Sequence, residues 1–241
     1  MHNRGMPFLS LMVLGTTLLV AQQIPRHVAT IPAERLSEDW WKQRHAACVA
    51  LTKKGGVDVV FLGDSITQGW EGGGRATWDK EFAPLKSANF GFSGDRTEHV
   101  LWRLENGEIV GLHPKLVVVM IGTNNIGHGS SNPQQAADGV HAIVEKLLSA
   151  LPGAKVLLLG IFPRGQFPAD KMRQDVATAT SLFKGLDDHK RVFFLDIGYA
   201  FLRSDGELRT TLMPDMLHLT SDGYEIWAQA MKPELTRLLG K

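Results

Sequence analysis

Residues 57–67, VDVVFLGDSIT, are the stretch that decides the fold. An apolar run rich in β-branched residues ends abruptly in Gly63, Asp64 and Ser65. Such a run of about four to eight residues, bounded by a turn signal, is typical of a buried strand in a parallel sheet. Open α/β sheets bind their ligands where strands end and loops begin. Ser65 therefore stands where such a protein places its chemistry, although one serine is weak evidence alone.

Further candidate strands follow, and segments with helical periodicity separate them. The strands are expected at residues 87–90, which form a short one, and at 116–121, 155–161 and 192–196; the helical segments lie at 34–52, 98–104, 133–151, 171–187 and 221–239. Alternating strands and helices, with each strand a continuous apolar run, predict an α/β fold with a five-stranded parallel sheet. We find no internal repeat and expect a single domain.

The two outermost helices carry specific expectations. The last helix, at residues 221–239, is expected to begin with a cap at Ser221. The first helix, at residues 34–52, should bury one apolar side. The residues of that side are Leu36, Trp40, Ala47, Val49 and Leu51.

A glycine-rich segment follows the decisive strand. Residues 69–74 contain Trp70 and precede Trp78. A phosphate-binding loop would carry Gly-Lys-Ser/Thr at the start of a helix, and that sequence is absent. We expect a mobile loop beside the candidate site. The alternative is that Trp70 or Trp78 contacts the substrate.

Composition narrows the classes of partner. The chain is 44% hydrophobic and 21% charged, which is ordinary for a globular protein, and its net charge is only +1. Because no basic stripe or acidic tail is present, nucleic acid and anionic membrane surfaces are poor candidate partners. Cys48 is the only cysteine. A single cysteine rules out an internal disulfide and a cysteine-based zinc site.

The N-terminus resembles an export signal. Arg4 precedes an apolar run from Phe8 to Ala21, and the chain then turns polar. This arrangement predicts a signal peptide over residues 1–21, and hence a periplasmic or secreted protein. The run is shorter than the roughly 20 residues of a membrane span, although an uncleaved membrane anchor remains the alternative. Residues 22–33 then read as a linker to a domain at 34–241.

Serine is a weak nucleophile unless a base removes its proton and hydrogen-bond donors stabilise the oxyanion formed on attack. The segments after the second and third predicted strands carry suitable donors. Gly94 has no Cβ, so a carbonyl oxygen can approach its backbone N–H, and Asn124 offers a side-chain amide. With the N–H of Ser65 these groups would form an oxyanion hole. Taken alone, Asn124 is more often a loop-capping residue.

His218 is the candidate base, and Asp215 lies three residues earlier. In a turn or helix this separation puts both side chains on the same side. Asp215 would accept the Nδ1–H of His218 and leave Nε2 free to deprotonate Ser65. His113 and His128, which flank the third predicted strand, lack the spacing of metal ligands such as H-E-x-x-H. We therefore expect no metal site.

At this point the sequence resembles the SGNH (GDSL-type) hydrolases. The four blocks of that family are matched, in order, by Gly63-Asp64-Ser65, Gly94, Gly122-Thr123-Asn124-Asn125 and Asp215-Met216-Leu217-His218. Within the family, residues 89–107 and 159–165 are most similar to the catalytic subunits of intracellular platelet-activating-factor acetylhydrolase. The resemblance covers roughly residues 40–239.

The resemblance implies a flavodoxin-like three-layer α/β/α sandwich. It also implies Ser65 as nucleophile, His218 as base and Asp215 as the residue that orients it. The oxyanion hole would come from Ser65, Gly94 and Asn124, with no metal or organic cofactor. A homodimer is implied in the same way. The predicted signal peptide is foreign to the cytosolic subunits, so their phospholipid substrate does not carry over directly.

Four residues beside the catalytic positions are candidates for lining the substrate pocket: Ile66, Thr123, Phe162 and Leu217. For each of them, plain core packing is at least as reasonable an interpretation. No long apolar lid is evident, which favours a short acyl group such as acetyl.

The leading hypothesis is a serine esterase that cleaves short-chain O-esters through an acyl-enzyme. Its substrate would be a small molecule, an acetylated sugar or a short-acyl lipid ester. A non-catalytic binding or scaffold protein on the same fold is the alternative from another class. A nucleotide- or flavin-binding module is a third, but it needs a phosphate-binding loop, and none is visible.

Overall fold

The computed structural model describes residue 1 and residues 23–240. The predicted signal peptide and its cleavage site lie outside these residues. Within the described part of the chain, no helix combines the length and apolar character needed to cross a membrane.

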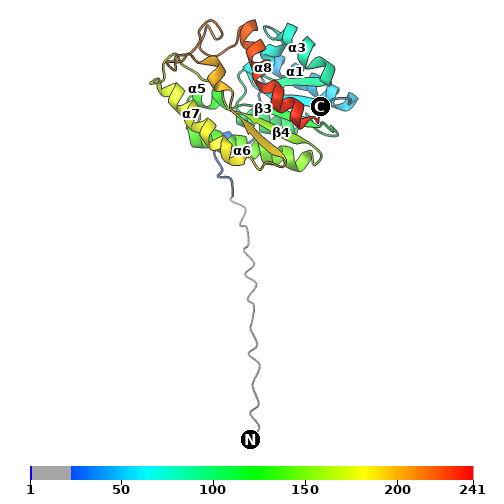
Figure 1. Ribbon diagram of the computed structural model, residues 1–241. Helices are drawn as coiled ribbons and strands as arrows, with labels where there is room; N and C mark the ends of the chain where they lie inside the picture. Colours follow the sequence, from blue (N-terminus) through cyan, green and yellow to red (C-terminus); the bar gives the residue numbers. More distant parts are fainter. Residues whose placement is uncertain (2–22, 241) are drawn as a thin grey trace.

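A five-stranded, fully parallel sheet forms the centre of the domain (Figure 1). Its strands are β1 (Val59–Gly63), β2 (Ser87–Gly91), β3 (Leu116–Met120), β4 (Lys155–Leu159) and β5 (Val192–Leu195). The strand order is β2-β1-β3-β4-β5. This is the order of flavodoxin-like folds, with a topological switch point beside β1. The predicted α/β class and the five-stranded parallel sheet are confirmed.

Helices cover both faces of the sheet, which makes the three-layer sandwich. The longer helices are α1 (Asp39–Lys54), α4 (Thr97–Glu105), α6 (Pro133–Ala150), α7 (Lys171–Phe183) and α8 (Ser221–Leu238). Shorter helices are α2 (Ser65–Gln68), α3 (Arg75–Glu81) and α5 (Thr123–Gly127), and 3₁₀ turns are η1 (Val28–Thr30), η2 (Gly69–Glu71), η3 (Ala83–Leu85), η4 (Lys184–Leu186) and η5 (Gly198–Phe201).

The alternation of side chains along β1 divides the core in two. Val60 and Leu62 face a cluster built with α1, α4, α6 and α7. Val59 and Phe61 face a second cluster, built with η2, η5 and α8. The central strands β1 and β3 are buried along their whole length because helices lie on both sides of the sheet, and this explains their continuous apolar runs. The edge strands β2 and β5 are only partly buried.

The first helix begins later than expected and buries another side. It starts at Asp39, and its buried residues are Trp41, His45, Cys48 and Thr52, whereas Trp40 and Leu51 are exposed. The expected apolar side was wrong because two polar residues belong to the buried face. His45 Nε2 contacts the carbonyl of Asn106 at 3.1 Å, and the Thr52 hydroxyl donates to the carbonyl of Glu108. The last helix is likewise capped by Thr220 rather than Ser221.

The glycine-rich segment after β1 is not the loop that we expected, because residues 69–71 form η2 and residues 72–74 form a short turn that leads into α3. Trp70 is fully buried, with ring centroids 4.6 Å from Tyr224 and 4.8 Å from Trp227. The glycines make room for this packing. A Cβ at Gly69 would lie 1.9 Å from the Tyr224 hydroxyl, and one at Gly74 would lie 2.5 Å from the Trp70 ring. Trp70 is therefore a core residue and not a substrate contact.

Residues 27–38, here called the N-terminal strap, pack along the domain. The strap includes η1 and part of the segment that we expected to be a linker. His27 Nε2 lies 3.0 Å from Asp138 Oδ2 on α6. The carbonyl of Ala29 accepts the hydroxyl of Thr97, and the N–H of Ala33 donates to the carbonyl of Glu98 on α4. Contacts between this segment and the domain thus begin about a dozen residues before α1.

Candidate active site

Ser65 lies in the turn between β1 and α2, at the carboxyl edge of the sheet. Asp64 caps α2, since its Oδ1 accepts the N–H of Ile66 at 2.9 Å. Gly63 is required by close packing: a Cβ there would lie 2.4 Å from the carbonyl oxygen of Met120 on the neighbouring strand. The tight turn holds the Ser65 side chain only partly buried, where solvent and a ligand can reach it.

The loop before α8 brings His218 to Ser65. The Ser65 Oγ and His218 Nε2 are 2.9 Å apart, although the two residues are separated by 153 positions. His218 Nδ1 lies 2.6 Å from Asp215 Oδ2. The other carboxylate oxygen of Asp215 accepts the backbone N–H groups of Leu217 and His218, at 3.0 and 2.7 Å. The serine, the imidazole and the carboxylate therefore lie in one hydrogen-bonded line.

The ionisation of Asp215 suits this arrangement. Partial burial by itself would raise the pKa of Asp215, but the hydrogen bonds from the His218 backbone and imidazole and from the Leu217 N–H outweigh it. The net effect is a pKa below the usual value for aspartate. An ionised Asp215 accepts the Nδ1–H of His218, which leaves Nε2 as the acceptor that faces Ser65.

The candidate oxyanion donors flank Ser65 because of the strand order. β1 lies between β2 and β3, so the segments that follow those strands meet on either side of Ser65. Gly94 follows β2 and has a φ of +73°, in the left-handed region that glycine tolerates best. Asn124 follows β3, and its Nδ2 donates to the carbonyl of Asp95 at 2.9 Å. An amide nitrogen carries two hydrogens, so one remains for a further acceptor.

Comparison with known proteins identifies the family. The model of the GDSL-like lipase/acylhydrolase family matches residues 61–226. The human platelet-activating factor acetylhydrolase IB subunit alpha1 is 41% identical over 202 residues, covering 83% of this chain and 85% of that protein. The rat alpha2 subunit is 40% identical over 197 residues, covering 81% and 82%. The chain belongs to the GDSL-like lipase/acylhydrolase family. It is a carboxylic-ester hydrolase.

Solved structures agree on the fold. A GDSL-like lipase from Bacteroides thetaiotaomicron superimposes with a TM-score of 0.66 at 22% identity, covering 81% of this chain and 97% of that one. An acetylxylan esterase from Geobacillus stearothermophilus gives a TM-score of 0.60 at 19% identity, covering 78% and 95%.

In this hydrolase the buried carboxyl of Asp64 lies directly before Ser65. Burial raises the pKa of Asp64 to about 7, and the hydrogen bond from the Ile66 N–H opposes that shift. The structure thus holds close to the serine a carboxyl group that titrates near neutral pH. Its role in the turn is structural, since its Oδ1 caps α2.

The four predicted pocket residues differ in their surroundings. Ile66 and Phe162 are each 1% exposed, and the ring of Phe162 packs against Phe201 with centroids 4.5 Å apart. Thr123 is buried, while Leu217 is partly buried against the second core cluster, the one that contains Phe61 and Phe162. Instead of an enclosed tunnel, an open groove adjoins Ser65. It is lined by Ser65, Gln68, Gly69, Glu71, Gly72 and Ser93.

Sequence reasoning missed three polar side chains around the site. Arg164 Nη1 donates to the carbonyl of Thr123, and burial lowers the pKa of this guanidinium. The Gln68 Oε1 accepts the N–H of Ser93, and Arg35 donates to the carbonyl of Ser93. Arg35 is 58 residues from Ser93 in sequence, so no local pattern could have revealed the contact.

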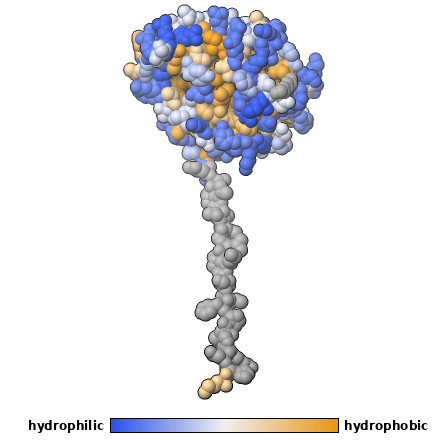
Figure 2. All heavy atoms as spheres, viewed as in Figure 1, coloured by the Kyte–Doolittle hydropathy of each residue, from blue (hydrophilic) through white to orange (hydrophobic). Residues whose placement is uncertain are grey.

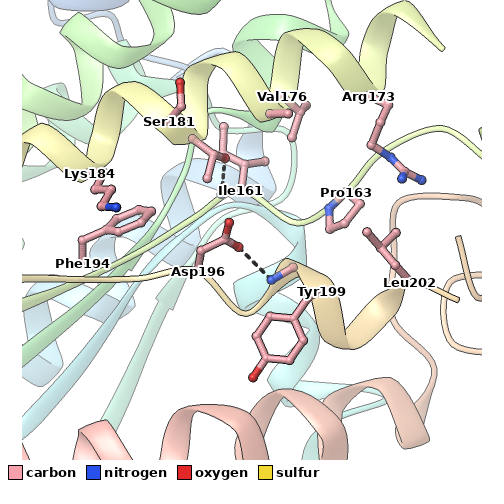
Figure 3. A pocket seen from close by; sticks show the side chains of 13 residues that line it. Ile161, Pro163, Arg173, Val176, Ser181, Lys184, Phe194, Asp196, Tyr199 and Leu202 are labelled. Atoms are coloured by element: carbon pink, nitrogen blue, oxygen red, sulfur yellow. Dashed lines mark hydrogen bonds between the residues drawn. The ribbon is translucent and has the colours of Figure 1, made fainter. Parts of the chain in front are cut away.

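A separate hollow of about 370 Å³ lies between α7, β5 and η5 (Figure 3). Ile161, Val176 and Phe194 give it apolar walls, and none of the candidate site residues lines it. Its rim includes Tyr199, which is 71% exposed. On the face seen in Figure 2, apolar side chains gather in a band among hydrophilic ones, in the region where Figure 1 shows α7 and α8. Because the hollow and the Ser65 groove share no lining residue, they are two distinct sites.

Proposed function

We propose that this hydrolase is an exported serine esterase that removes short acyl groups, acetyl above all, from oxygen esters. The observation that carries the proposal is the hydrogen-bonded line from Ser65 through His218 to Asp215, with contacts of 2.9 and 2.6 Å. Ser65 lies 153 positions from His218 in the sequence, yet the two side chains are in contact, and this supports nucleophilic catalysis by the serine.

In the proposed reaction, Ser65 Oγ attacks the ester carbonyl while His218 Nε2 takes its proton. Asp215 keeps the imidazole in place and stabilises the imidazolium. The tetrahedral oxyanion accepts hydrogen bonds from the N–H groups of Ser65 and Gly94 and from Asn124. His218 then protonates the leaving alcohol, and an acyl group remains on Ser65. Water, deprotonated by the same histidine, attacks this ester and releases the acid.

Two lines of support favour a short acyl group. The names of both kinds of relative, platelet-activating factor acetylhydrolase and acetylxylan esterase, specify acetyl esters. The groove beside Ser65 is lined by polar residues and glycines, and it therefore offers no apolar wall to a long acyl chain. The open groove over Ser65 would take the alcohol, for which we consider acetylated sugars, short-acyl lipids and small molecules.

Export is proposed from the N-terminal sequence alone, through Arg4 and the apolar run to Ala21. The test is the N-terminus of the protein recovered outside the cytoplasm, which should begin at Gln22. A homodimer is proposed from the resemblance, and light scattering on the purified protein would measure it.

The decisive experiment compares wild type with Ser65→Ala. We expect p-nitrophenyl acetate hydrolysis to fall by about 10⁴-fold or more, since removal of the nucleophile leaves only binding and the oxyanion hole. A fluorophosphonate probe should label wild type and not the variant. Undiminished hydrolysis by Ser65→Ala would overturn the proposal, and a folded wild type that is never labelled would favour the scaffold alternative. Acetate release from acetylated xylan, acetylated sugars and a short-chain phospholipid would then identify the alcohol.

A further inference from the structure

Arg35 of the N-terminal strap reaches the loop that carries Gly94. Its Nη1 donates to the carbonyl of Ser93 and to Asp95 Oδ1, both at 2.8 Å. Its Nε and Nη2 donate to the two carboxylate oxygens of Glu38, at 2.8 and 2.9 Å. A Cβ at Gly94 would lie only 3.4 Å from both terminal nitrogens of Arg35. The guanidinium thus lies directly against the loop after β2, whose Gly94 N–H is a candidate oxyanion donor.

The contact with Ser93 acts on the proposed oxyanion donor itself. The carbonyl of Ser93 and the N–H of Gly94 belong to one peptide unit, which is planar, so the two groups point in opposite directions. Fixing the direction of the oxygen therefore fixes the direction of the N–H. This matters at Gly94 because a glycine offers the least resistance to rotation of the peptide before it.

The same contact also strengthens the donor. A hydrogen bond from a charged guanidinium is among the stronger kinds. It withdraws electron density from the Ser93 carbonyl and so makes the Gly94 N–H more acidic, because hydrogen bonds in a chain polarise one another. Arg35 thereby acts on an oxyanion without having to touch it.

A buried network holds Arg35 in place. Asp95 is fully buried; its Oδ1 also accepts the indole N–H of Trp41 at 2.8 Å, and its Oδ2 accepts Arg103 Nε at 2.9 Å. Arg103 is itself paired with the buried Glu108. Asp95, Arg103 and Glu108 are fully buried, and the partly exposed Arg35 is the second guanidinium on Asp95, so each buried charge has a partner. The network gives Arg35 little freedom to move away from Ser93.

We propose that Arg35 is a positioning residue for the oxyanion hole, acting through the Ser93–Gly94 peptide. This inference rests on the proposed function, because it assumes that Gly94 N–H stabilises the oxyanion. The competing interpretation is that Arg35 only fastens the strap to the domain. The interpretations differ in outcome, since a fastening role affects unfolding, whereas a positioning role affects the chemical step.

The test compares Arg35→Gln and Arg35→Lys with two matched controls. Glu38→Gln removes the charge of the exposed partner of Arg35 and changes neither Ser93 nor Asp95. Arg75→Gln removes an exposed arginine that pairs only with Asp79. We expect Arg35→Gln to lower kcat for p-nitrophenyl acetate by about 10- to 100-fold, less than the loss of an oxyanion donor itself. KM should change by less than about twofold, because the interaction strengthens only in the transition state.

Two further readouts separate positioning from fastening. The affinity for a trifluoromethyl ketone, which forms an oxyanion on the attacking serine, should fall in the same ratio as kcat/KM. In Arg35→Ala, added guanidinium at millimolar concentration should restore part of kcat, whereas urea, a neutral molecule of the same shape, should not. Arg35→Lys keeps the charge and should retain intermediate activity.

The outcomes are distinct. A wild type that is inactive, or a Ser65→Ala variant that is active, would end the proposed function. An active wild type with Arg35→Gln within about twofold of it in kcat would overturn only this inference. An equal loss of kcat in Glu38→Gln would overturn it as well, because the loss would then come from loosening the strap and not from the Ser93 contact. If Arg35→Gln does not fold, Arg35→Lys decides: lowered kcat at unchanged KM supports positioning, and unchanged kcat overturns it.

Discussion

At the scale of single residues, the environment decides what each carboxyl group near Ser65 can do. Asp215 accepts several hydrogen bonds and has a lowered pKa, whereas burial raises the pKa of Asp64 to about 7. The two aspartates lie on either side of the same serine and histidine. One of them stays ionised over the neutral range, and the other changes charge within it. The spacing of Asp215 and His218 in the sequence indicates their pairing, whereas nothing in the sequence indicates that the pKa of Asp64 is raised.

Asp64→Asn should remove a pH dependence of stability. Between about pH 4 and pH 7 the folded protein keeps a proton on Asp64 that the unfolded chain has lost, so stability falls as the pH rises through this window. Asparagine cannot ionise and still caps a helix. We expect the variant to match wild type below about pH 3.5 and to exceed it by roughly 2–4 kcal/mol at pH 8.

Urea unfolding at a series of pH values measures this difference. Asp79→Asn, at an exposed aspartate, is the control and should follow wild type throughout. A variant whose stability falls between pH 5 and pH 8 as steeply as that of wild type would show that Asp64 is not the source of the slope.

At the scale of elements, the site depends on close approaches between backbones. Helix α6 contains Gly139, where a Cβ would lie 2.3 Å from the hydroxyl oxygen of Thr97 and 2.6 Å from the carbonyl oxygen of Ala29. The glycine lets the N-terminal strap lie against both α6 and α4. This contact sets the path of the strap toward the loop with Gly94.

Gly139→Ala should therefore destabilise the protein. In an ordinary helix interior the change would stabilise by about 1 kcal/mol, since alanine is the better helix former. Here the added methyl group would collide with the backbone of Ala29, and we expect a net loss of about 1–3 kcal/mol. Chemical denaturation measures it, with Gly153→Ala as control because nothing lies within 4 Å of a Cβ there. Any gain in stability would contradict this expectation and show that the backbone at Ala29 shifts at little cost to make room for the methyl group.

At the scale of the whole molecule, one sheet edge collects segments from along the entire domain. The strap, the turn after β1, the loops after β2 and β3 and the loop before α8 all meet there. The strand order β2-β1-β3 places the Ser65 turn between its neighbours. The long loop before α8 supplies the imidazole. The strap is the least expected member of the assembly, since its residues 27–33 were expected to be a linker and its residues 34–38 the start of a helix.

Truncation separates the strap from the segment before it. A chain that starts at Gln23 should keep the stability and kcat of the full chain, because every described contact lies beyond that point. A chain that starts at Asp39 loses Ala29 and Arg35 together. We expect its kcat to fall at least as far as that of Arg35→Gln, about 10-fold or more, and its melting temperature to drop. Full activity in the shorter chain would rule out a catalytic contribution from the strap.

Much of the fold could be predicted because its signals are local. The central strands β1 and β3 are continuous apolar runs, helices such as α6 have a 3.6-residue apolar period, and both follow from burial on a parallel sheet. The side of α1 that faces the core could not be predicted. Its buried face uses His45 and Thr52, which are tolerated there only because carbonyls of the segment after α4 accept their hydrogen bonds.

The sequence by itself determined the order of the elements, the residues that belong to the GDSL-like blocks and the pairing of Asp215 with His218 three positions apart. Only the tertiary structure decided the 2.9 Å approach of His218 to Ser65, the packing of Trp70 in the core and the clamp of Arg35 on Ser93. The physical reason is the sequence distance over which each kind of interaction acts. Periodicity, capping and turn preferences act over a few residues, whereas these contacts join segments brought together only when the sheet and its covering helices have packed.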